Sequence, residues 1–454
     1  MKREQLPAWV VAITLIGSAV SACCLRPISG ADLHDGGETD LPDAGPDAGV
    51  DAGVDAGFDA GPCASFDAWS RPRLACVVPR DAGACEPGPV SNLNDFGTYS
   101  PTLWMGDIAS ADMNGDGLLD LVSARFPHAE DGGYGLGLDV FLARSDGGLS
   151  PPVHYSGTFG FTLAVGDLND DAGPGVVVAN GGELDVFGND GSGGLTPVGA
   201  LEVSEYFGID QIAIVDLNQD GLADIVFAGD VPPALSGSID VFWGQPCGGF
   251  AGPSVLAAAG GNAYIAFAVG DLNGDCLPDL VANTTDFSQL MVMLNEGDGG
   301  FQTSLYPVPA LSEITLLPDA RGTPDLVLGV TGYPFDSKLV DDGLQLLWNR
   351  GDGTFAAGPD RRVGGYGTIV GDFNGDCIPD LVTSFGTDCS VDDWQVTVLF
   401  GDGDGGFGNL TTLNGAGLTS GRFALLGPVR EPRALAVGDS CGHGLRVFGD
   451  ASSH

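Results

Sequence analysis

The stretch Asp271-Leu272-Asn273-Gly274-Asp275-Cys276-Leu277-Pro278-Asp279 carries oxygen-bearing side chains at its first, third, fifth and ninth positions. The pattern Asp-x-Asn-x-Asp-x-x-x-Asp is complete in four places and has lost its last acid in a fifth. Complete copies span 112–120, 216–224, 271–279 and 372–380, and the damaged copy spans 167–175. Because the copies start 49 to 55 residues apart (112 to 167, 167 to 216, 216 to 271), they mark a structural repeat rather than one active site.

Each copy lies between short apolar runs, and a glycine turn such as Asp298-Gly299-Gly300-Phe301 follows further along. Short apolar runs separated by turns are typical of strands, and glycine supplies the positive φ of a tight hairpin. No long amphipathic helical pattern is present, so we expect an all-β protein. First strands are expected at 163–166, 212–215, 267–270 and 368–371, and third strands at 138–142, 184–187, 239–243, 290–294, 344–348 and 396–400.

Two further units, 316–330 and 425–448, keep the strand pattern but have lost the acidic turn. In the first of them Asp319 to Asp325 is two residues too short, and in the second Pro428 to Pro432 replaces the turn. Seven units of about fifty residues, with four strands each, predict a seven-bladed β-propeller of four-stranded blades. The last unit ends after its third strand, so the segment 89–96 is expected to supply its fourth strand and close the ring.

The acidic turns, together with the Gly-Gly-Phe turns, resemble the FG-GAP/VCBS repeats of integrin-α-like propellers. The resemblance covers about residues 89–450, where several spaced residues recur in register. It implies a seven-bladed propeller with calcium in the turns between the first and second strands, on one face of the disc.

Each complete turn offers the all-oxygen ligand set that calcium takes at about 2.3 to 2.6 Å, and such a set disfavours zinc or copper. We expect side-chain oxygens from positions one, three and five, the backbone carbonyl of position seven, and the ninth-position carboxylate to close the shell. The alternative is an Asx-rich turn held by its own hydrogen bonds without an ion. The expected Ca²⁺ ligands are Asp112, Asn114, Asp116, Leu118 and Asp120; Asp216, Asn218, Asp220, Leu222 and Asp224; Asp271, Asn273, Asp275, Leu277 and Asp279; Asp372, Asn374, Asp376, Ile378 and Asp380; and, in a weak or empty fifth site, Asp167, Asn169 and Asp171.

Position six of such a turn favours glycine, as at Gly117 and Gly221, but Cys276 and Cys377 depart from this pattern. A left-handed residue other than glycine costs about 1 kcal/mol, so either these turns relax or the cysteines are held for another reason.

Ten cysteines in an exported chain suggest disulfides. Propeller geometry favours the pairs Cys247 with Cys276 and Cys389 with Cys441. The remaining set is Cys377 with Cys63, Cys76 and Cys85, which would attach the segment 63–88 to the propeller.

The N-terminus resembles a bacterial lipoprotein signal: Lys2 and Arg3 precede an apolar run, and small residues precede Cys23, the expected lipidation site. An ordinary secretory signal cleaved nearby is the alternative. We therefore expect a signal peptide at 1–22, a disordered Asp-Ala-Gly tether at 23–62, a cysteine-containing connector at 63–88 and the propeller at 89–450. A calcium-binding tract is the second interpretation of the tether. The expected location is the outer membrane or the cell surface.

The formal charge of −44, from 61 acidic against 17 basic residues, disfavours nucleic acid and anionic lipid surfaces as partners. We expect a membrane-tethered, monomeric, non-catalytic module that binds a protein or glycan through the long loops on the face opposite the metal turns. These loops, 124–137, 228–237, 282–289, 329–343 and 384–394, contain Phe126, Tyr134, Phe287, Tyr333, Phe335 and Trp394. The alternatives are a polysaccharide-cleaving hydrolase or lyase, for which His128 and His443 are the candidate pair, and a structural envelope protein.

Overall fold

The computed structural model describes the strands and most of the turns of the repeat region, and every regular element among the described residues is a β-strand. All of these strands belong to one compact unit, Asp59–His454. In the part of the chain described, no helix is long and apolar enough to cross a membrane. The described residues are 94–99, 104–126, 137–157, 160, 162–168, 173–203, 208–231, 236–246, 249–258, 266–284, 288–297, 299–308, 311–319, 321–330, 343–361, 363, 365–385, 395–403, 405–413, 422–428, 434–438 and 445–449.

Five antiparallel sheets contain four strands each, paired in chain order. The sheets comprise β6 (Leu163–Gly166), β7 (Gly175–Asn180), β8 (Glu183–Asn189) and β9 (Leu195–Glu202); β10 (Gly208–Val215), β11 (Asp224–Val231), β12 (Ser236–Gly244) and β13 (Phe250–Ala258); β14 (Phe267–Gly270), β15 (Asp279–Asn283), β16 (Gln289–Asn295) and β17 (Phe301–Pro307); β18 (Leu311–Leu317), β19 (Asp325–Val330), β20 (Gly343–Asn349) and β21 (Phe355–Arg361); and β22 (Tyr366–Gly371), β23 (Asp380–Phe385), β24 (Gln395–Gly401) and β25 (Phe407–Leu413).

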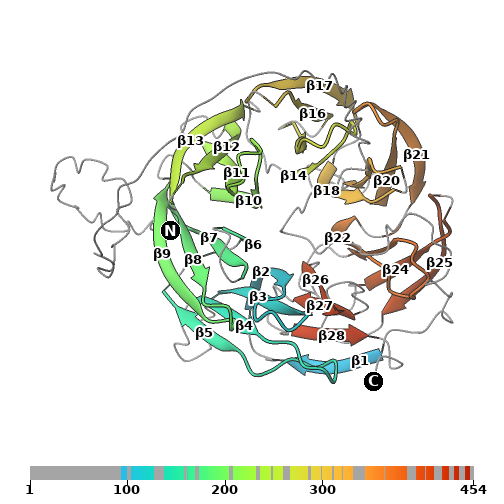
Figure 1. Cartoon of the computed structure of the whole chain (residues 1–454). Helices are drawn as coiled ribbons and strands as arrows, with labels where there is room; N and C mark the ends of the chain where they lie inside the picture. Colours follow the sequence, from blue (N-terminus) through green and yellow to red (C-terminus); the bar gives the residue numbers. More distant parts are fainter. Residues whose placement is uncertain are drawn as a thin grey trace, which may run out of the picture. The chain divides into compact units, whose positions relative to one another are not determined.

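The remaining eight strands form one larger sheet made of two four-stranded sets. One set is β2 (Trp104–Ala111), β3 (Leu118–Phe126), β4 (Gly137–Phe141) and β5 (Val153–Ser156), and the other is β26 (Arg422–Pro428), β27 (Ala434–Gly438), β28 (Leu445–Gly449) and β1 (Asn94–Tyr99). Strand pairing joins the two sets only where Gly427 and Pro428 pair with Leu119 and Leu118, and an apolar cluster packs the two sets against each other. Within this unit the sheets follow one another around a ring, with the first strand of each innermost (Figure 1). The all-β propeller fold predicted from the repeats is confirmed.

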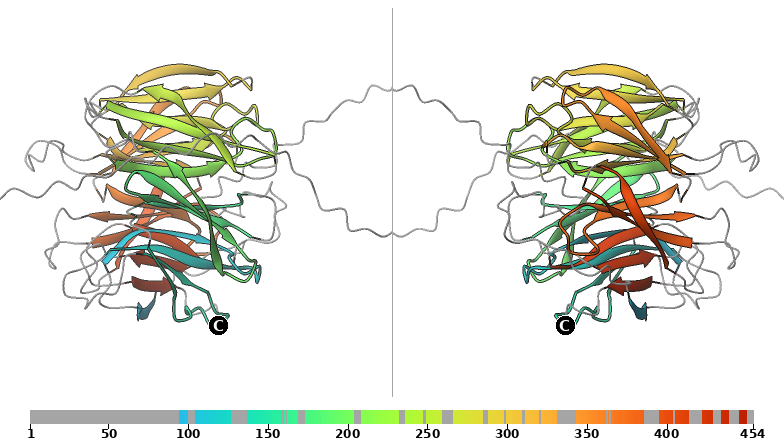
Figure 2. Two further views of the ribbon diagram at one scale, coloured as in Figure 1. Left: turned by 90° about the vertical axis from the view of Figure 1, so that its left-hand side faces the viewer. Right: turned by 90° about the vertical axis from the view of Figure 1, so that its right-hand side faces the viewer.

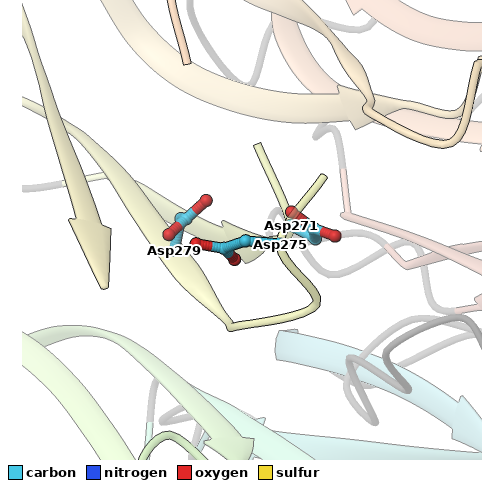
Figure 3. A group of neighbouring side chains, drawn as sticks. All are labelled: Asp271, Asp275 and Asp279. Atoms are coloured by element: carbon cyan, nitrogen blue, oxygen red, sulfur yellow. The ribbon is translucent and has the colours of Figure 1, made fainter. Parts of the chain in front are cut away.

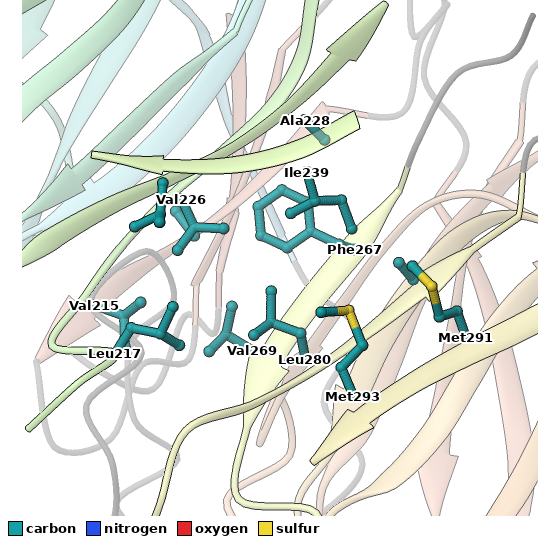
Figure 4. Packing of buried hydrophobic residues seen from close by; sticks show 13 residues of the cluster. Val215, Leu217, Val226, Ala228, Ile239, Phe267, Val269, Leu280, Met291 and Met293 are labelled. Carbon is teal, nitrogen blue, oxygen red and sulfur yellow. The ribbon is translucent and has the colours of Figure 1, made fainter. Parts of the chain in front are cut away.

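Neighbouring sheets pack face to face (Figure 2). Buried apolar side chains fill the space between them. One cluster joins β10 to β12 with β14 to β16, where Val226 and Ile239 of one sheet lie against Phe267 and Leu280 of the next (Figure 4). A polar contact crosses the same interface: Gln211 donates to the carbonyl of Phe267 at 2.7 Å and accepts from its amide at 2.9 Å. The core is therefore a series of layers between sheets rather than one central mass.

Burial within each sheet explains the sequence pattern of its strands. The second strands β15 and β19 are buried along their whole length, because sheets cover both of their faces. For this reason they read as nearly continuous apolar runs, such as 326–330 after the first acid of β19. The outermost strands β9, β13 and β17 are mostly exposed and carry mixed residues.

The predicted closure of the ring is confirmed, although its segment is displaced. The first strand before the repeats is Asn94–Tyr99, rather than the predicted 89–96, and it pairs with Leu445–Gly449. The ladder passes a bulge between Asp95 and Gly97 and extends to Tyr99, whose hydroxyl accepts a hydrogen bond from the amide of Leu149 at 3.3 Å. The local sequence pattern carries no information on this tertiary contact. It therefore predicted the strand a few residues too early.

Several sequence predictions fall outside the described residues: the signal peptide with Cys23, the tether, the connector, His128, His443 and all cysteines except Cys276 and Cys377. Tyr134, Phe287, Tyr333, Phe335 and Trp394 of the proposed recognition loops also lie outside them, as does the side chain of Phe126.

Candidate metal-binding turns

The fourth acidic turn connects β14 to β15 and gathers three carboxylates (Figure 3). Asp271, Asp275 and Asp279 each offer one oxygen, and these oxygens lie within 4.8 Å of one another. Two calcium ligands on opposite sides of an ion, each at about 2.4 Å, are about 4.8 Å apart. The described carboxylates therefore fit a calcium ion without rearrangement of the turn.

Backbone amides of the turn itself orient the first carboxylate. Asp271 accepts hydrogen bonds from Gly274 at 2.7 Å and from Cys276 at 3.0 Å, so its side chain points into the loop. Asp275 likewise accepts from the amide of Leu277 at 2.9 Å. The turn is thus an Asx-type structure held by its own hydrogen bonds. Oδ2 of Asp271 and Oδ1 of Asp275 each accept one of these bonds and keep a lone pair for a cation.

The other three complete turns have a similar pattern of hydrogen bonds to their first acid. The first-position carboxylate accepts from the amides of positions five and six in each of them, at 2.8 to 3.1 Å, and the third-position Asn donates to the fifth-position Asp at 3.0 to 3.1 Å. The acids that make these bonds are Asp112, Asp216 and Asp372, and the Asn donors are Asn114, Asn218 and Asn374. Hydrogen bonds therefore hold the first, third and fifth side chains of each turn together, but among the described residues only the fourth turn brings three acids within 4.8 Å of one another.

The ninth-position Asp of each turn has a structural role that the sequence reasoning did not assign. Asp120, Asp224, Asp279 and Asp380 are all fully buried. In each, one oxygen accepts the amide of position two at 2.8 to 2.9 Å, and the other accepts an amide at the end of the third strand at 2.6 to 2.9 Å. This carboxylate joins the turn to the third strand whether or not it also contacts a metal.

Burial of these carboxylates shifts their ionisation. It raises the pKa of Asp120 and Asp224 to about 6, and the pKa of Asp279 and Asp380 to about 7. Hydrogen bonds from the backbone oppose this effect, whereas the neighbouring acids of each turn strengthen it. A divalent cation among these acids would favour their charged form.

The damaged second turn leaves no room for the missing acid. Gly175 stands at the ninth position, and a Cβ there would lie 2.6 Å from Cδ1 of Leu168 and 2.7 Å from the carbonyl oxygen of Phe187. Asp167 is described, whereas Asn169 and Asp171 lie outside the described residues. A carboxylate at this position would therefore require its neighbours to move, and the weak or empty site stays a prediction.

The shortened fifth turn holds a guanidinium among its acids. Nε of Arg321 donates to Asp319 at 2.7 Å, and Nη2 donates to Asp325 at 2.9 Å. Partial burial alone would raise the pKa of Asp319, but the hydrogen bonds and charge of Arg321 hold it below its usual value. The sequence showed that this turn is shortened, but the role of Arg321 was not predicted. A basic residue between two acids was the signal that could have indicated it.

Three residues other than glycine adopt left-handed backbone in these turns: Gln219, Cys276 and Cys377, with φ of 56°, 67° and 63°. The turns at Cys276 and Cys377 therefore keep the glycine conformation instead of relaxing. Gln219 lies at position four of the third turn, and its side chain donates to the carbonyl of Cys276 in the fourth turn at 2.5 Å. Both cysteines are disulfide-bonded, and the pairings given above stay predictions because their partner cysteines are outside the described residues.

An asparagine at the end of the third strand connects neighbouring sheets in three places. Its side-chain amide donates 2.8 Å hydrogen bonds to the position-two carbonyl of the preceding acidic turn: Asn189 to Met113, Asn295 to Leu217 and Asn349 to Leu272. Its side-chain oxygen accepts the amide of the glycine two residues later. Sequence reasoning missed these residues, although the recurrent Asn-x-Gly after the third strand was a signal.

Similarity to known proteins agrees with this architecture. Residues 167–227 and 216–282 match a model described as FG-GAP-like repeat. Integrin alpha-7 from Homo sapiens is 30% identical over 170 residues, which cover 32% of this chain and 14% of the integrin. These matches support an FG-GAP, integrin-like β-propeller.

Two solved structures are similar to this chain. The structure of BBS1N in complex with ARL6DN has a TM-score of 0.50 at 13% identity, over 80% of this chain and 99% of that chain. The Agrocybe aegerita lectin that recognises non-reducing terminal N-acetylglucosamine has a TM-score of 0.47 at 19% identity, over 68% of this chain and 80% of that chain.

Proposed function

We propose that this chain is a calcium-stabilised binding module that performs no catalysis. The observation that carries the proposal is the gathering of Asp271, Asp275 and Asp279 within 4.8 Å. The other three complete turns have the same sequence pattern and also bind their first acid through backbone amides. Positions one, three, five, seven and nine would hold the ion, which supplies positive charge to a cluster of acids. The residues of the chain orient the oxygens through backbone amides and join each turn to its third strand.

The calcium proposal is tested by metal content and melting of the purified protein. We expect about four calcium ions per chain and a lower melting temperature in chelator. Asp271→Asn should remove one ion. The matched control is Asp190→Asn, because Asp190 accepts amide bonds from Ser192 and Gly194 in an exposed turn without neighbouring ligand acids. Unchanged melting in chelator together with no bound metal would refute the proposal.

The seven-blade count belongs to the same proposal. It assigns one blade to each four-stranded sheet and one to each half of the eight-stranded sheet, so that β1 completes the last blade. The short pairing of Gly427 and Pro428 with Leu119 and Leu118 supports this division, because only two residue pairs continue the ladder from one half to the other. A crystal structure with continuous pairing between β26 and β3 would argue against it.

We propose that recognition lies on the loops opposite the acidic turns and that the ligand is a protein or a glycan. The acids and amides of the turns already form hydrogen bonds within the turn and with neighbouring sheets. Loops on a rigid scaffold, by contrast, can vary in sequence and carry recognition. Peptide and glycan arrays test this proposal. No binding on either array, together with an envelope defect on deletion, would favour the structural-protein alternative.

The tethering proposal rests on the N-terminal sequence. Cys23 would carry the lipid, and the Asp-Ala-Gly segment would separate the propeller from the membrane. Mass spectrometry of the mature N-terminus tests it. A Cys23→Ser protein that still partitions into detergent like the unchanged chain would contradict it.

The enzymatic alternative is tested on polysaccharide panels. His128 and His443 were its candidates, and His154 is a further histidine to include, since its Nδ1 lies 2.8 Å from the buried carboxylate of Asp139. Turnover that disappears in a His→Ala variant of unchanged stability would replace the binding-module proposal.

A further inference from the structure

The fifth turn differs from the others in length and in charge. It runs from Asp319 to Asp325 between β18 and β19, two residues shorter than the complete turns, and retains two acids. Asp325 occupies the place of the ninth-position acid, because its Oδ1 accepts the amide of Asn349 at 2.6 Å, as Asp279 accepts the amide of Asn295 at 2.8 Å. Asp325 therefore keeps the hydrogen bond that joins a closing acid to the end of the third strand.

Arg321 places a positive charge between the two acids of this turn. Its backbone amide donates to Asp319 at 2.8 Å, its Nε donates to the same carboxylate at 2.7 Å, and its Nη2 donates to Asp325 at 2.9 Å. Its Nη1 donates to the carbonyl of Asn349 at 2.5 Å. A guanidinium offers five donors in a fixed planar arrangement, so one side chain can join two acids and a carbonyl.

We propose that Arg321 is a built-in cation that replaces the metal ion in the fifth turn, so that this blade holds its structure without calcium. The acids it joins are those that would otherwise face a metal, and the position of the charge is fixed by chain connectivity rather than by the concentration of an ion. The proposal rests on the proposed calcium sites only for the comparison between turns.

Arg321 also supports the neighbouring turn. Asn349, which accepts from Arg321 through its carbonyl, donates its side-chain amide to the carbonyl of Leu272, and the amide of Leu272 donates to Asp279 at 2.8 Å. A continuous set of hydrogen bonds therefore runs from the guanidinium to the closing acid of the fourth turn. The arginine holds one side of the fourth calcium turn in place when the ion is absent.

Hydrogen exchange of the mature chain, with and without chelator, tests this role. In the unchanged protein, chelator should speed exchange in the first, third and sixth turns but not at residues 321–325 or at Asn349. Arg321→Gln should speed exchange at those positions by about tenfold or more, equally with and without calcium, because hydrogen bonds to charged groups are lost. The exchange rates of Arg321→Lys should lie between those of the unchanged protein and Arg321→Gln, because lysine keeps the charge but not the planar donor set.

Arg144→Gln is the matched control. Arg144 also pairs with an Asp two residues away and is 52% exposed, against 50% for Arg321, but Asp146 is its only ion-pair partner among the described residues. Arg144→Gln should leave hydrogen exchange in the fifth turn unchanged.

Two results would overturn the proposal: exchange in Arg321→Gln within about twofold of the unchanged protein, or a fifth turn as sensitive to chelator as the complete turns. If chelator affects no turn, the calcium proposal fails, while the arginine variants still decide the role of Arg321.

Discussion

The side-chain amide of Asn295 donates a 2.8 Å hydrogen bond to the carbonyl of Leu217, 78 residues earlier in the chain and in the neighbouring sheet. The same amide reaches the carbonyl of Pro278 at 3.1 Å, so one buried asparagine joins two acidic turns. The acidic turns are consequently part of the interfaces between sheets. A change in one turn is expected to affect the packing of the next.

Asn295→Ala should destabilise the protein by about 1 to 3 kcal/mol, because two buried carbonyls lose their donor. Chemical denaturation measures the loss. Asn180→Ala is the comparison, since Asn180 bonds Asp185 within a single hairpin and is only partly buried. Equal losses of unfolding free energy in the two variants would show that the contact between sheets stabilises the protein no more than a bond within one hairpin.

The ion-free protein should become less stable as the pH rises from about 4 to about 7. The folded-state pKa of the four closing acids is raised to about 6 or 7, above the value of 3.8 for an exposed Asp. Between these values the folded state binds more protons than the unfolded state, so stability falls with increasing pH. Melting in chelator across this range measures the trend, and a rise in stability would contradict it.

With calcium present the same pH series should flatten or reverse, because protons and the cation compete for the closing acids. The difference between the two series reports on ion binding independently of the total stability. Parallel curves with and without calcium would indicate that these acids do not contact the ion.

Gly175→Asp should not restore a metal site in the second turn, although it completes the sequence pattern. Its Cβ would meet the backbone oxygen of Phe187 at 2.7 Å, so we expect a loss of about 1 to 3 kcal/mol and no additional calcium by calorimetry. Gly199→Asp in the same sheet is the control, since no atom lies within 4 Å of a Cβ there. An additional bound ion in the Gly175 variant would show that the turn can open.

Cys276→Gly should stabilise the reduced protein by about 1 kcal/mol, because the left-handed backbone at φ 67° no longer carries a side chain. Under oxidising conditions the same change should destabilise it, since the disulfide is lost. Denaturation with and without reductant separates the two effects. No difference between the two conditions would argue against a disulfide at this position.

The repeat spacing located most strands to within a few residues, because each apolar run and each turn has a local signature. The strand expected at 89–96 was misplaced, since its register depends on pairing with Leu445–Gly449 at the far end of the chain. The closing acids were assigned as ligands only, because their hydrogen bonds to the third strand join residues 16 to 23 positions apart. Gly175 shows the same limit: its neighbours Leu168 and Phe187 become visible only in the packed sheet.

The sequence by itself determined the repeat, its all-β character and the acids of each turn, since these are set by local spacing and by the alternation of apolar runs with glycine turns. Tertiary structure alone decided that Arg321 faces Asp319 and Asp325, and that Asn189, Asn295 and Asn349 each hold the preceding turn. The physical reason is that a buried polar group must find its partner in whichever chain segment the sheets bring beside it, at any sequence distance.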